Sequence, residues 1–396
     1  MVVGSTVPPS SALSLFAAIL LAATLLSAFA QRTAFSTAVL FIAAGFAAGS
    51  SGLGWVHLDH GSETVQALAT VALFCVLYSD GMEAGAAILR RIWGLSARAL
   101  LVGMPLSIAI AAAIAVSALG LTWTQALLVS AVLAPTDPVF ASGLVRRDDV
   151  PARLRQLLNV ESGLNDGLAL PVVVVLLGLL GAPEPGIGRL MLEVAGGAAL
   201  GIALAFAAAA LRRCSHTSLP RIQASLFVLS VGLLAFALAQ ALEVNLYLCA
   251  YCAGATLATR APRTARTFAP AGEYLSELSK FATLFAFGVL LPTWAFTDIG
   301  WGGWLFVAGL LLVARPVSIA VSLAGTQMPV HERIAAAWFG PKGFASVVYA
   351  LMVAASHVPR AGKLFELAAV AVTVSIVAHS TTDVPIARWL ARDSQD

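Results

Sequence analysis

The sequence predicts an all-α polytopic membrane protein. Of its 396 residues, 59% are hydrophobic and only 11% are charged, whereas a soluble domain carries about 25% charged residues. The mean hydropathy is +0.90. The apolar residues are gathered in runs of about 17 to 25, the length that crosses a bilayer as a helix. We therefore expect membrane lipid to surround the protein, and we expect no nucleic-acid partner.

Glycine, proline and clusters of charge separate about thirteen such runs, each of which we take as a membrane-spanning helix. In the first half of the chain the predicted spans are 11–30, 33–53, 64–80, 97–119, 124–145 and 156–181. In the second half they are 190–211, 222–241, 244–260, 275–293, 301–324, 332–356 and 364–390. Many spans carry glycine and alanine on one side, which allows helices to pack closely in a membrane.

Lysine and arginine concentrate in alternate loops of this layout, as expected for loops on the cytoplasmic side of a membrane. One such loop contains Arg260, Arg263, Arg266 and Lys280. The asymmetry predicts a multi-pass protein of the plasma (inner) membrane, with its N-terminus outside and its C-terminus in the cytoplasm. The last predicted span is followed only by a short charged stretch, so we predict a single membrane unit over 1–396 without a soluble tail domain.

Asp137 lies in an unusual place, between Pro135 and Pro138 in the apolar segment VLAPTDPVFASGL (132–144). Each proline removes a helical hydrogen bond and leaves a carbonyl without its partner. Within a bilayer, irregular backbone is tolerated only where it is buried in protein or lines a wet cavity. A carboxylate beside freed carbonyls suits a hard cation. The alternative is a plain proline kink, but a kink alone does not need a carboxylate at its apex.

The next span carries one polar stripe, in the segment VESGLNDGLALPVVV (160–174). Residues four apart share a face of a helix, so Glu161 lies over Asn165 and Ser162 lies over Asp166. A buried carboxylate such as Asp166 can hold either a proton or a cation, but not both at once. This exclusion is a physical basis for exchange.

A third irregular stretch, Gly340-Pro341-Lys342-Gly343, interrupts the span 332–356. Under the predicted layout this span and the span 124–145 cross the membrane in opposite directions. Two interrupted helices in inverted repeats are typical of secondary transporters with a site near the midplane. Asp137 and Lys342 carry the signs needed to compensate the exposed helix ends.

Asp80 and Arg315 are two further charges inside predicted spans that we take as candidates. Each such charge costs at least about 2.5 kcal/mol to insert and is a functional candidate by default. The alternative for any one of them is a structural ion pair that holds the helices together.

With these residues assembled, the chain resembles the CPA1 group of monovalent cation/proton antiporters, the bacterial NhaP-like sodium/proton exchangers. The resemblance rests on T-D-P (136–138), E-S-G-L-N-D (161–166), A-R-P (314–316) and G-P-K-G (340–343), and on the segments 73–83, 244–258 and 278–291. It implies a homodimer of thirteen-helix protomers, each with a dimer domain and a mobile core domain that contains two crossed broken helices. We expect the core domain to include spans near 64–181 and 275–356, interleaved with dimer-domain helices.

The resemblance also implies roles for individual residues. Asp166 resembles the carboxylate that alternately binds cation and proton. Asp137, Ser162 and Thr136 resemble further ligands of the monovalent cation, Thr136 through its backbone carbonyl, and Asn165 stands where electrogenic relatives place a second aspartate.

Four further charges are placed by the same resemblance. Glu161 resembles the acidic partner of a buried basic residue on the second broken helix, where this chain has Lys342 in place of the commoner arginine. The pair is expected to be structural, with a proton-carrying lysine as the alternative. Asp80 lies where relatives often carry a glutamate near the site, and Arg315 resembles a charge that stabilises the core.

The predicted function is electroneutral exchange of Na⁺, Li⁺ or K⁺ for H⁺ by alternating access, with a role in pH homeostasis, no enzymatic activity and no cofactor. A cation channel would also use buried carboxylates, but it needs a continuous pore with a ring or filter, and no repeated carbonyl filter is present in the sequence. An intramembrane aspartyl protease could use Asp137 and Asp166, but its usual G-x-G-D context is missing.

Overall fold

The structure, a computed structural model, describes residues 9–30, 37–59, 62–83, 94–137, 150–181, 187–214 and 219–393. Within these ranges all regular structure is helical, as the sequence predicts. Residues 138–145, the end of the predicted span 124–145, lie outside them.

The described residues of the first half of the chain form helices up to α9, which carries the polar stripe. These are α1 (Pro9–Ala30), α2 (Thr37–Ala48), α3 (Glu63–Glu83), α5 (Leu95–Arg98), the π-helix η1 (Ala99–Gly103), α6 (Met104–Leu119), α7 (Trp123–Val132) and α9 (Ala152–Gly181).

The second half of the chain contains the second interruption, between α17 and α18. Its described helices are α10 (Ile187–Cys214), α11 (Arg221–Ala241), α12 (Leu246–Arg260), α13 (Pro262–Leu290), α14 (Ala295–Asp298), α15 (Gly300–Gly309), the π-helix η3 (Leu310–Ala314), α16 (Arg315–Ser322), α17 (Val330–Trp338), α18 (Phe344–Ala355) and α19 (Ala361–Asp393).

Seven helical runs in the described residues are long and apolar enough to cross a membrane. Two of the shorter apolar helices, α7 and α18, adjoin the interruptions. A multi-pass membrane protein is therefore confirmed, whereas the count of thirteen spans stays a prediction. Two of the seven runs combine several elements, namely Leu95–Leu119 and Gly300–Ser322.

These two composite runs are built alike. Each contains a single π-helical turn, η1 or η3, and each continues as an α-helix with proline near its start, at Pro105 or Pro316. A proline removes one backbone hydrogen bond of the preceding turn, and π-turns occur where the regular ladder is disturbed. The turn η1 packs on α16 and η3 packs on α6, which is the reciprocal contact expected of two related repeats.

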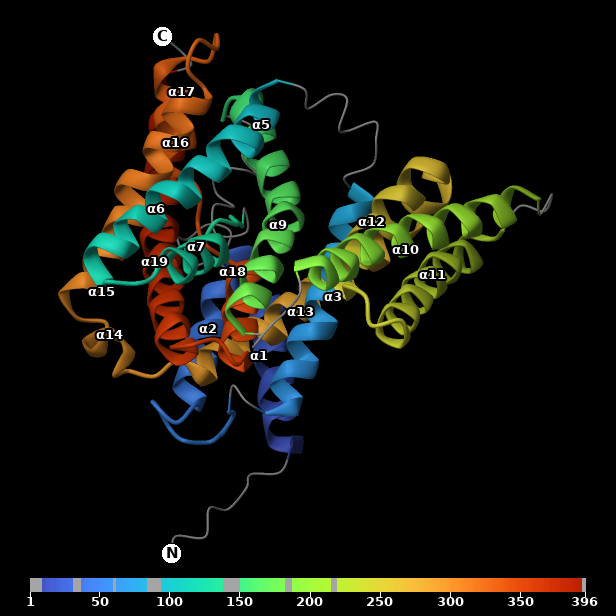
Figure 1. Ribbon diagram of the computed structural model, residues 1–396, viewed down its shortest axis with the longest axis horizontal. Helices are drawn as coiled ribbons and strands as arrows, with labels where there is room; N and C mark the ends of the chain where they lie inside the picture. The colour runs from blue at the N-terminus through green and yellow to red at the C-terminus, as the bar shows by residue number, and fades with distance from the viewer. Residues whose placement is uncertain are drawn as a thin grey trace, which may run out of the picture.

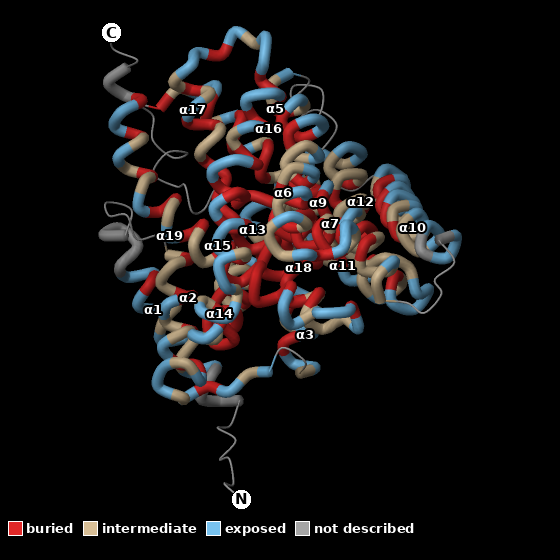
Figure 2. The backbone as a smooth tube through the Cα atoms, turned by 60° about the vertical axis from the view of Figure 1, so that its left-hand side comes forward, coloured by how far each residue is buried: buried red, intermediate tan, exposed pale blue. Residues whose placement is uncertain are grey.

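The helices form two groups that meet along one seam (Figure 1). In one group α2 packs on α13, and α3 packs on α12 and α13, while α10 and α11 cover α12 at one side of the molecule. In the other group α6, α7, α9 and α15 to α19 pack on one another. At the seam α3 contacts α9 and α18, and α13 contacts α18. Figure 2 shows buried residues concentrated in the interior and exposed ones on the outer faces of the helices.

Large apolar side chains cover those outer faces. Leu192 on α10 is 73% exposed, and Trp301 on α15 is 92% exposed. Such a surface would aggregate in water, whereas a bilayer solvates it.

The helix α13 corrects one sequence assignment. It begins at Pro262, so Arg263, Arg266 and Lys280 lie within a helix and not in a loop. Its first half is amphipathic, because residues three or four apart face the interior, namely Ala265, Phe268, Gly272 and Ser276. The predicted span 275–293 contains only the more apolar second half of α13, which still carries Lys280. The first half was missed because average hydropathy cannot detect a span whose other face is charged.

Both predicted interruptions are present in the described residues. The helix α7 ends at Val132, and Ala134–Asp137 has no helical structure. The helices α17 and α18 are separated by the non-helical stretch 339–343. The two interruptions touch, because the amide of Asp137 donates a hydrogen bond of 2.9 Å to the carbonyl of Pro341.

Candidate ion-binding site

Asp137 lies at the point where the two interruptions meet. It is 8% exposed, and its Oδ2 accepts a hydrogen bond of 3.3 Å from the amide of Phe344, the first residue of α18. A helix N-terminus carries a partial positive charge, which favours a carboxylate there. Gly343 allows the close approach, because a Cβ at this position would lie 2.1 Å from the Cβ of Asp137.

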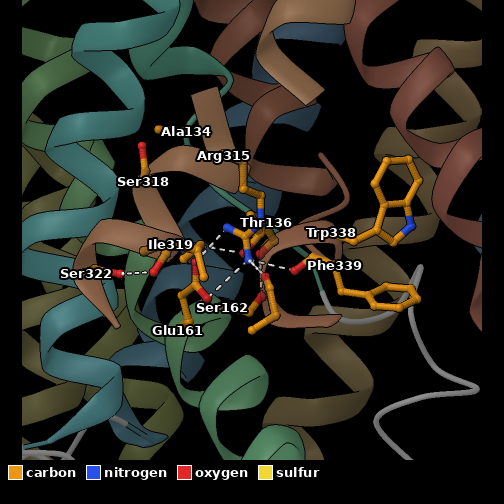
Figure 3. Close-up of polar contacts among 12 residues, drawn as sticks. Ala134, Thr136, Glu161, Ser162, Arg315, Ser318, Ile319, Ser322, Trp338 and Phe339 are labelled. Atoms are coloured by element: carbon orange, nitrogen blue, oxygen red, sulfur yellow. Dashed lines mark hydrogen bonds and ion pairs between the residues drawn. The ribbon is translucent and has the colours of Figure 1, made fainter. Parts of the chain in front are cut away.

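The polar stripe on α9 faces the first interruption. The hydroxyl of Ser162 donates to the carbonyl of Thr136, and Nδ2 of Asn165 donates to Oγ1 of Thr136 at 2.7 Å. All three residues are buried. Figure 3 shows Thr136 and Ser162 drawn toward each other from the two segments. Two residues of the stripe therefore hold the backbone and side chain of Thr136 in place.

Asp166 lies on the same helix and leaves oxygen atoms available. Its backbone carbonyl accepts a hydrogen bond of 2.7 Å from the hydroxyl of Tyr349 on α18. Its carboxylate Oδ1 and the side-chain Oδ1 of Asn165 are buried, and neither has a hydrogen-bond partner within the described part of the chain. Buried oxygens without a donor suit a hard cation or a proton.

Three carboxylates share this region. Asp80 on α3 and Asp137 both interact electrostatically with Asp166, although they come from segments far apart in the sequence. The three lie at the seam, since α3 packs on α9. Like charges gathered in a site of low dielectric repel one another strongly, so a bound cation or proton would stabilise the group.

Glu161 forms an ion pair with Arg315, at 2.7 Å between Oε1 and the guanidinium (Figure 3). A second hydrogen bond of 3.3 Å joins Oε2 to the same guanidinium. The guanidinium also donates to the carbonyl of Phe339 at 2.6 Å, at the end of α17. Both side chains are buried.

This pairing corrects the sequence prediction, which gave Glu161 the ammonium of Lys342 as its partner. Arginine presents donors in a planar fork that matches a carboxylate and still leaves a donor for a carbonyl, whereas lysine is a point charge. The prediction had the right type of partner for Glu161 but placed it on the wrong helix, since Arg315 begins α16. Arg315 is buried, and it also binds the second interruption.

Lys342 compensates the first interruption instead. Its side chain is almost fully buried, and its ammonium contacts the carbonyl of Ala134 at 3.4 Å. Each interruption therefore supplies the charge that compensates the backbone of the other, with Asp137 at the start of α18 and Lys342 at a carbonyl that follows α7.

The sequence pattern of the transmembrane sodium/hydrogen exchanger family matches residues 17–389 of the chain. The chain belongs to this family. The resemblance identified from its motifs is thereby confirmed, and the family is one of transporters rather than enzymes.

Named relatives agree with this membership. The chain is 26% identical over 370 residues to the K(+)/H(+) antiporter NhaP2 of Shewanella sp. strain MR-4, and 25% identical over 356 residues to the K(+)/H(+) antiporter NhaP of Alkalimonas amylolytica. These matches cover 92% and 89% of this chain but only 64% and 62% of the relatives. The chain thus spans somewhat less than two thirds of the length of these relatives.

The fold is that of a solved structure, the sodium proton antiporter MjNhaP1 from Methanocaldococcus jannaschii. The TM-score is 0.78 at 19% sequence identity, and the match covers 96% of this chain and 98% of the other. At this identity the likeness establishes the fold alone.

Sequence analysis did not identify Lys280 as a charged residue near the site of this sodium/hydrogen exchanger family member. Lys280 on α13 interacts electrostatically with Asp80, Asp137 and Asp166 across the seam. The available signal was its spacing, because Lys280 follows Ser276 by four residues and so continues the buried face of α13.

Proposed function

We propose that this protein exchanges a monovalent cation for protons across the plasma membrane. The observation that carries the proposal is the cluster of three carboxylates, those of Asp80, Asp137 and Asp166, where two interrupted helices meet. Buried oxygens beside them have no donor among the described residues. The names of the relatives, K(+)/H(+) antiporters and a sodium proton antiporter, support the same reaction.

In this proposal Asp166 holds either the cation or a proton. Asp137 adds a second carboxylate, and the carbonyl of Thr136 and the side chains of Ser162 and Asn165 supply neutral oxygens. The carbonyl of Thr136 already accepts the hydroxyl proton of Ser162, but a carbonyl oxygen has a second lone pair for a cation. Na⁺, Li⁺ and K⁺ are all candidate substrates, because each is a hard cation that binds oxygen.

We propose electroneutral exchange of one cation for one proton. Asn165 is neutral. A second carboxylate at this position, beside Asp166, could carry a second proton and so change the number of charges moved in each cycle. The pair Glu161 and Arg315 is internally neutral and is engaged with α17, which suits a structural role.

Alternating access would move one helix group against the other along the seam. The moving core group would contain α6, α7, α9 and α15 to α19, whereas α3 and α13, which the sequence prediction assigned to the core, pack on the opposite group. We further propose a homodimer, with the N-terminus outside and the C-terminus in the cytoplasm.

The test is exchange in proteoliposomes with an imposed pH gradient. Addition of Na⁺, Li⁺ or K⁺ is expected to collapse the gradient in vesicles with the wild-type protein, and Asp166→Asn is expected to abolish the effect. Asp298→Asn, the same substitution on the exposed helix α14, is the matched control. Wild-type exchange by Asp166→Asn would show that another group carries the proton.

A second measurement addresses charge balance. Electroneutral exchange is expected to be insensitive to a membrane potential set with valinomycin in K⁺-containing vesicles when Na⁺ or Li⁺ is the substrate. A clear voltage dependence would contradict the one-to-one stoichiometry. Cation flux driven by voltage without movement of protons would indicate a channel.

A further inference from the structure

A chain of hydrogen bonds from α19 spans the second interruption. The amide of Lys342 donates to Oγ of Ser375 at 2.9 Å, and this Oγ lies 3.2 Å from Nδ1 of His379. On the other side of the ring, Nε2 of His379 lies 2.9 Å from the carbonyl of Trp338. The chain therefore joins the last residue of α17 to a residue just before α18.

The donors along this chain run in one direction when the neutral imidazole carries its proton on Nε2. The hydroxyl of Ser375 accepts from an amide and still has its own proton to donate to Nδ1 of His379. With its proton on Nε2, the neutral imidazole then donates to the carbonyl of Trp338. Nδ1 is also 2.6 Å from the carbonyl of Ser375, a contact that needs a proton on Nδ1. A ring protonated on both nitrogens donates to both carbonyls, and Ser375 then holds the amide of Lys342 without donating to the ring.

The ring is held firmly between the two helices. His379 is 1% exposed and Ser375 is fully buried. The indole of Trp338 stacks on the imidazole, with ring centroids 5.1 Å apart and planes inclined by 27°.

A related arrangement occurs at the first interruption, where the serine donates to the backbone instead of accepting from it. There α9 supplies Ser162, whose hydroxyl binds the carbonyl of Thr136, and Asp166 follows four residues later. On α19 the corresponding pair is Ser375 and His379, at the same spacing. In each case the helix that follows a broken helix holds the break with a serine. The position that carries a carboxylate on α9 carries an imidazole on α19.

Residues at and next to these two anchored points contact the ion site. Pro341 accepts the hydrogen bond from the amide of Asp137, Lys342 reaches the carbonyl of Ala134, and Phe344 binds the carboxylate of Asp137. Any movement of the stretch 339–343 would therefore displace Asp137.

We propose that Ser375 and His379 are positioning residues, which hold the second interruption in the geometry that keeps Asp137 in the ion site. This inference rests on the proposed exchange function for its effect on transport. Its structural part, the anchoring of residues 339–343, stands without it.

The first test is hydrogen–deuterium exchange of the peptide that contains residues 339–343. Ser375→Ala leaves the amide of Lys342 without its acceptor, so deuterium uptake there is expected to rise by about fivefold or more, the effect of one lost hydrogen bond. Ser380→Ala is the matched control, because Ser380 is a buried serine on the same helix whose hydroxyl has no hydrogen-bond partner in the described residues. Equal uptake in Ser375→Ala and the wild type would overturn the proposal.

The second test is the KM for Na⁺ or K⁺ in proteoliposomes. Ser375→Ala and His379→Leu are expected to raise the KM by about fivefold, while His379→Gln, whose amide can donate to Trp338, restores part of the affinity. Thr382→Val is the control, because it removes a different hydrogen bond between α19 and Trp338, the one to the indole at 2.9 Å. An equal rise in Thr382→Val, or an unchanged KM in Ser375→Ala, would refute a specific positioning role.

The two measurements separate the two proposals. Deuterium uptake can be measured without transport. If the wild-type protein exchanges no cation, the proposed function is wrong, but the uptake of Ser375→Ala still tests the anchoring of residues 339–343. Should His379→Leu fail to fold, the milder Ser375→Ala decides both tests.

Discussion

The carboxylate of Glu161 and the guanidinium of Arg315 form a two-point ion pair inside the protein, with hydrogen bonds of 2.7 and 3.3 Å. The same guanidinium donates to the carbonyl of Phe339. One buried arginine therefore joins α9, α16 and the end of α17. Gly340 lies against it, because a Cβ there would come within 1.9 Å of its Nε.

We expect Arg315→Ala to destabilise the protein by about 3 to 5 kcal/mol, because it leaves the carboxylate of Glu161 buried and unpaired. Thermal unfolding in detergent measures the effect. Arg189→Ala is the control, since Arg189 is paired with Glu193 but 75% exposed, and such pairs contribute about 1 kcal/mol or less. Equal unfolding temperatures for the two variants would contradict a structural role of the buried pair.

We expect exchange to require a positive charge at position 342 but not specifically a lysine. Lys342→Arg should retain exchange, because it keeps a cation near the carbonyl of Ala134. Lys342→Met keeps a long apolar stem without the charge and should lower the unfolding temperature. Exchange rate and thermal unfolding are measured together. Loss of exchange in Lys342→Met with full thermal stability would indicate a lysine that takes part in transport.

Gly343→Ala is expected to reduce exchange by about tenfold or more, since the added methyl overlaps the side chain of Asp137 and overpacking costs about 1 to 3 kcal/mol. Gly163→Ala is a matched control on α9, because no atom lies within 4 Å of a Cβ there, and alanine favours a helix over glycine. The rate of cation-driven proton movement is the measurement. An active Gly343→Ala protein would show that Asp137 tolerates displacement.

In the wild-type protein the ammonium of Lys280 lies beside the three carboxylates, and its positive charge should repel a bound cation. We therefore expect Lys280→Gln to lower the KM for the transported cation and Lys280→Arg to leave it unchanged. Lys363→Gln is the control, since Lys363 is 57% exposed and paired with Glu366. A KM for Lys280→Gln equal to or above the wild-type value would be the contrary result.

Much of the fold could be predicted because its signals are local. A bilayer sets the length of a span, a proline disturbs its own turn, and residues four apart share a face, so the interruption at Asp137 and the stripe from Glu161 to Asp166 were identified from their own segments. The start of α13 was missed because its charged face lowers the average hydropathy of a helix whose other face is buried.

The sequence by itself determined that the chain is a multi-pass helical protein with two interrupted spans and a small set of charges inside the membrane. Only the tertiary structure decided which charges meet. It paired Glu161 with Arg315, turned Lys342 toward the carbonyl of Ala134 and brought Lys280 to the carboxylates. Composition and periodicity describe one helix at a time. The partner of a buried charge depends on how helices far apart in sequence pack, and on which donor has the shape that its acceptor requires.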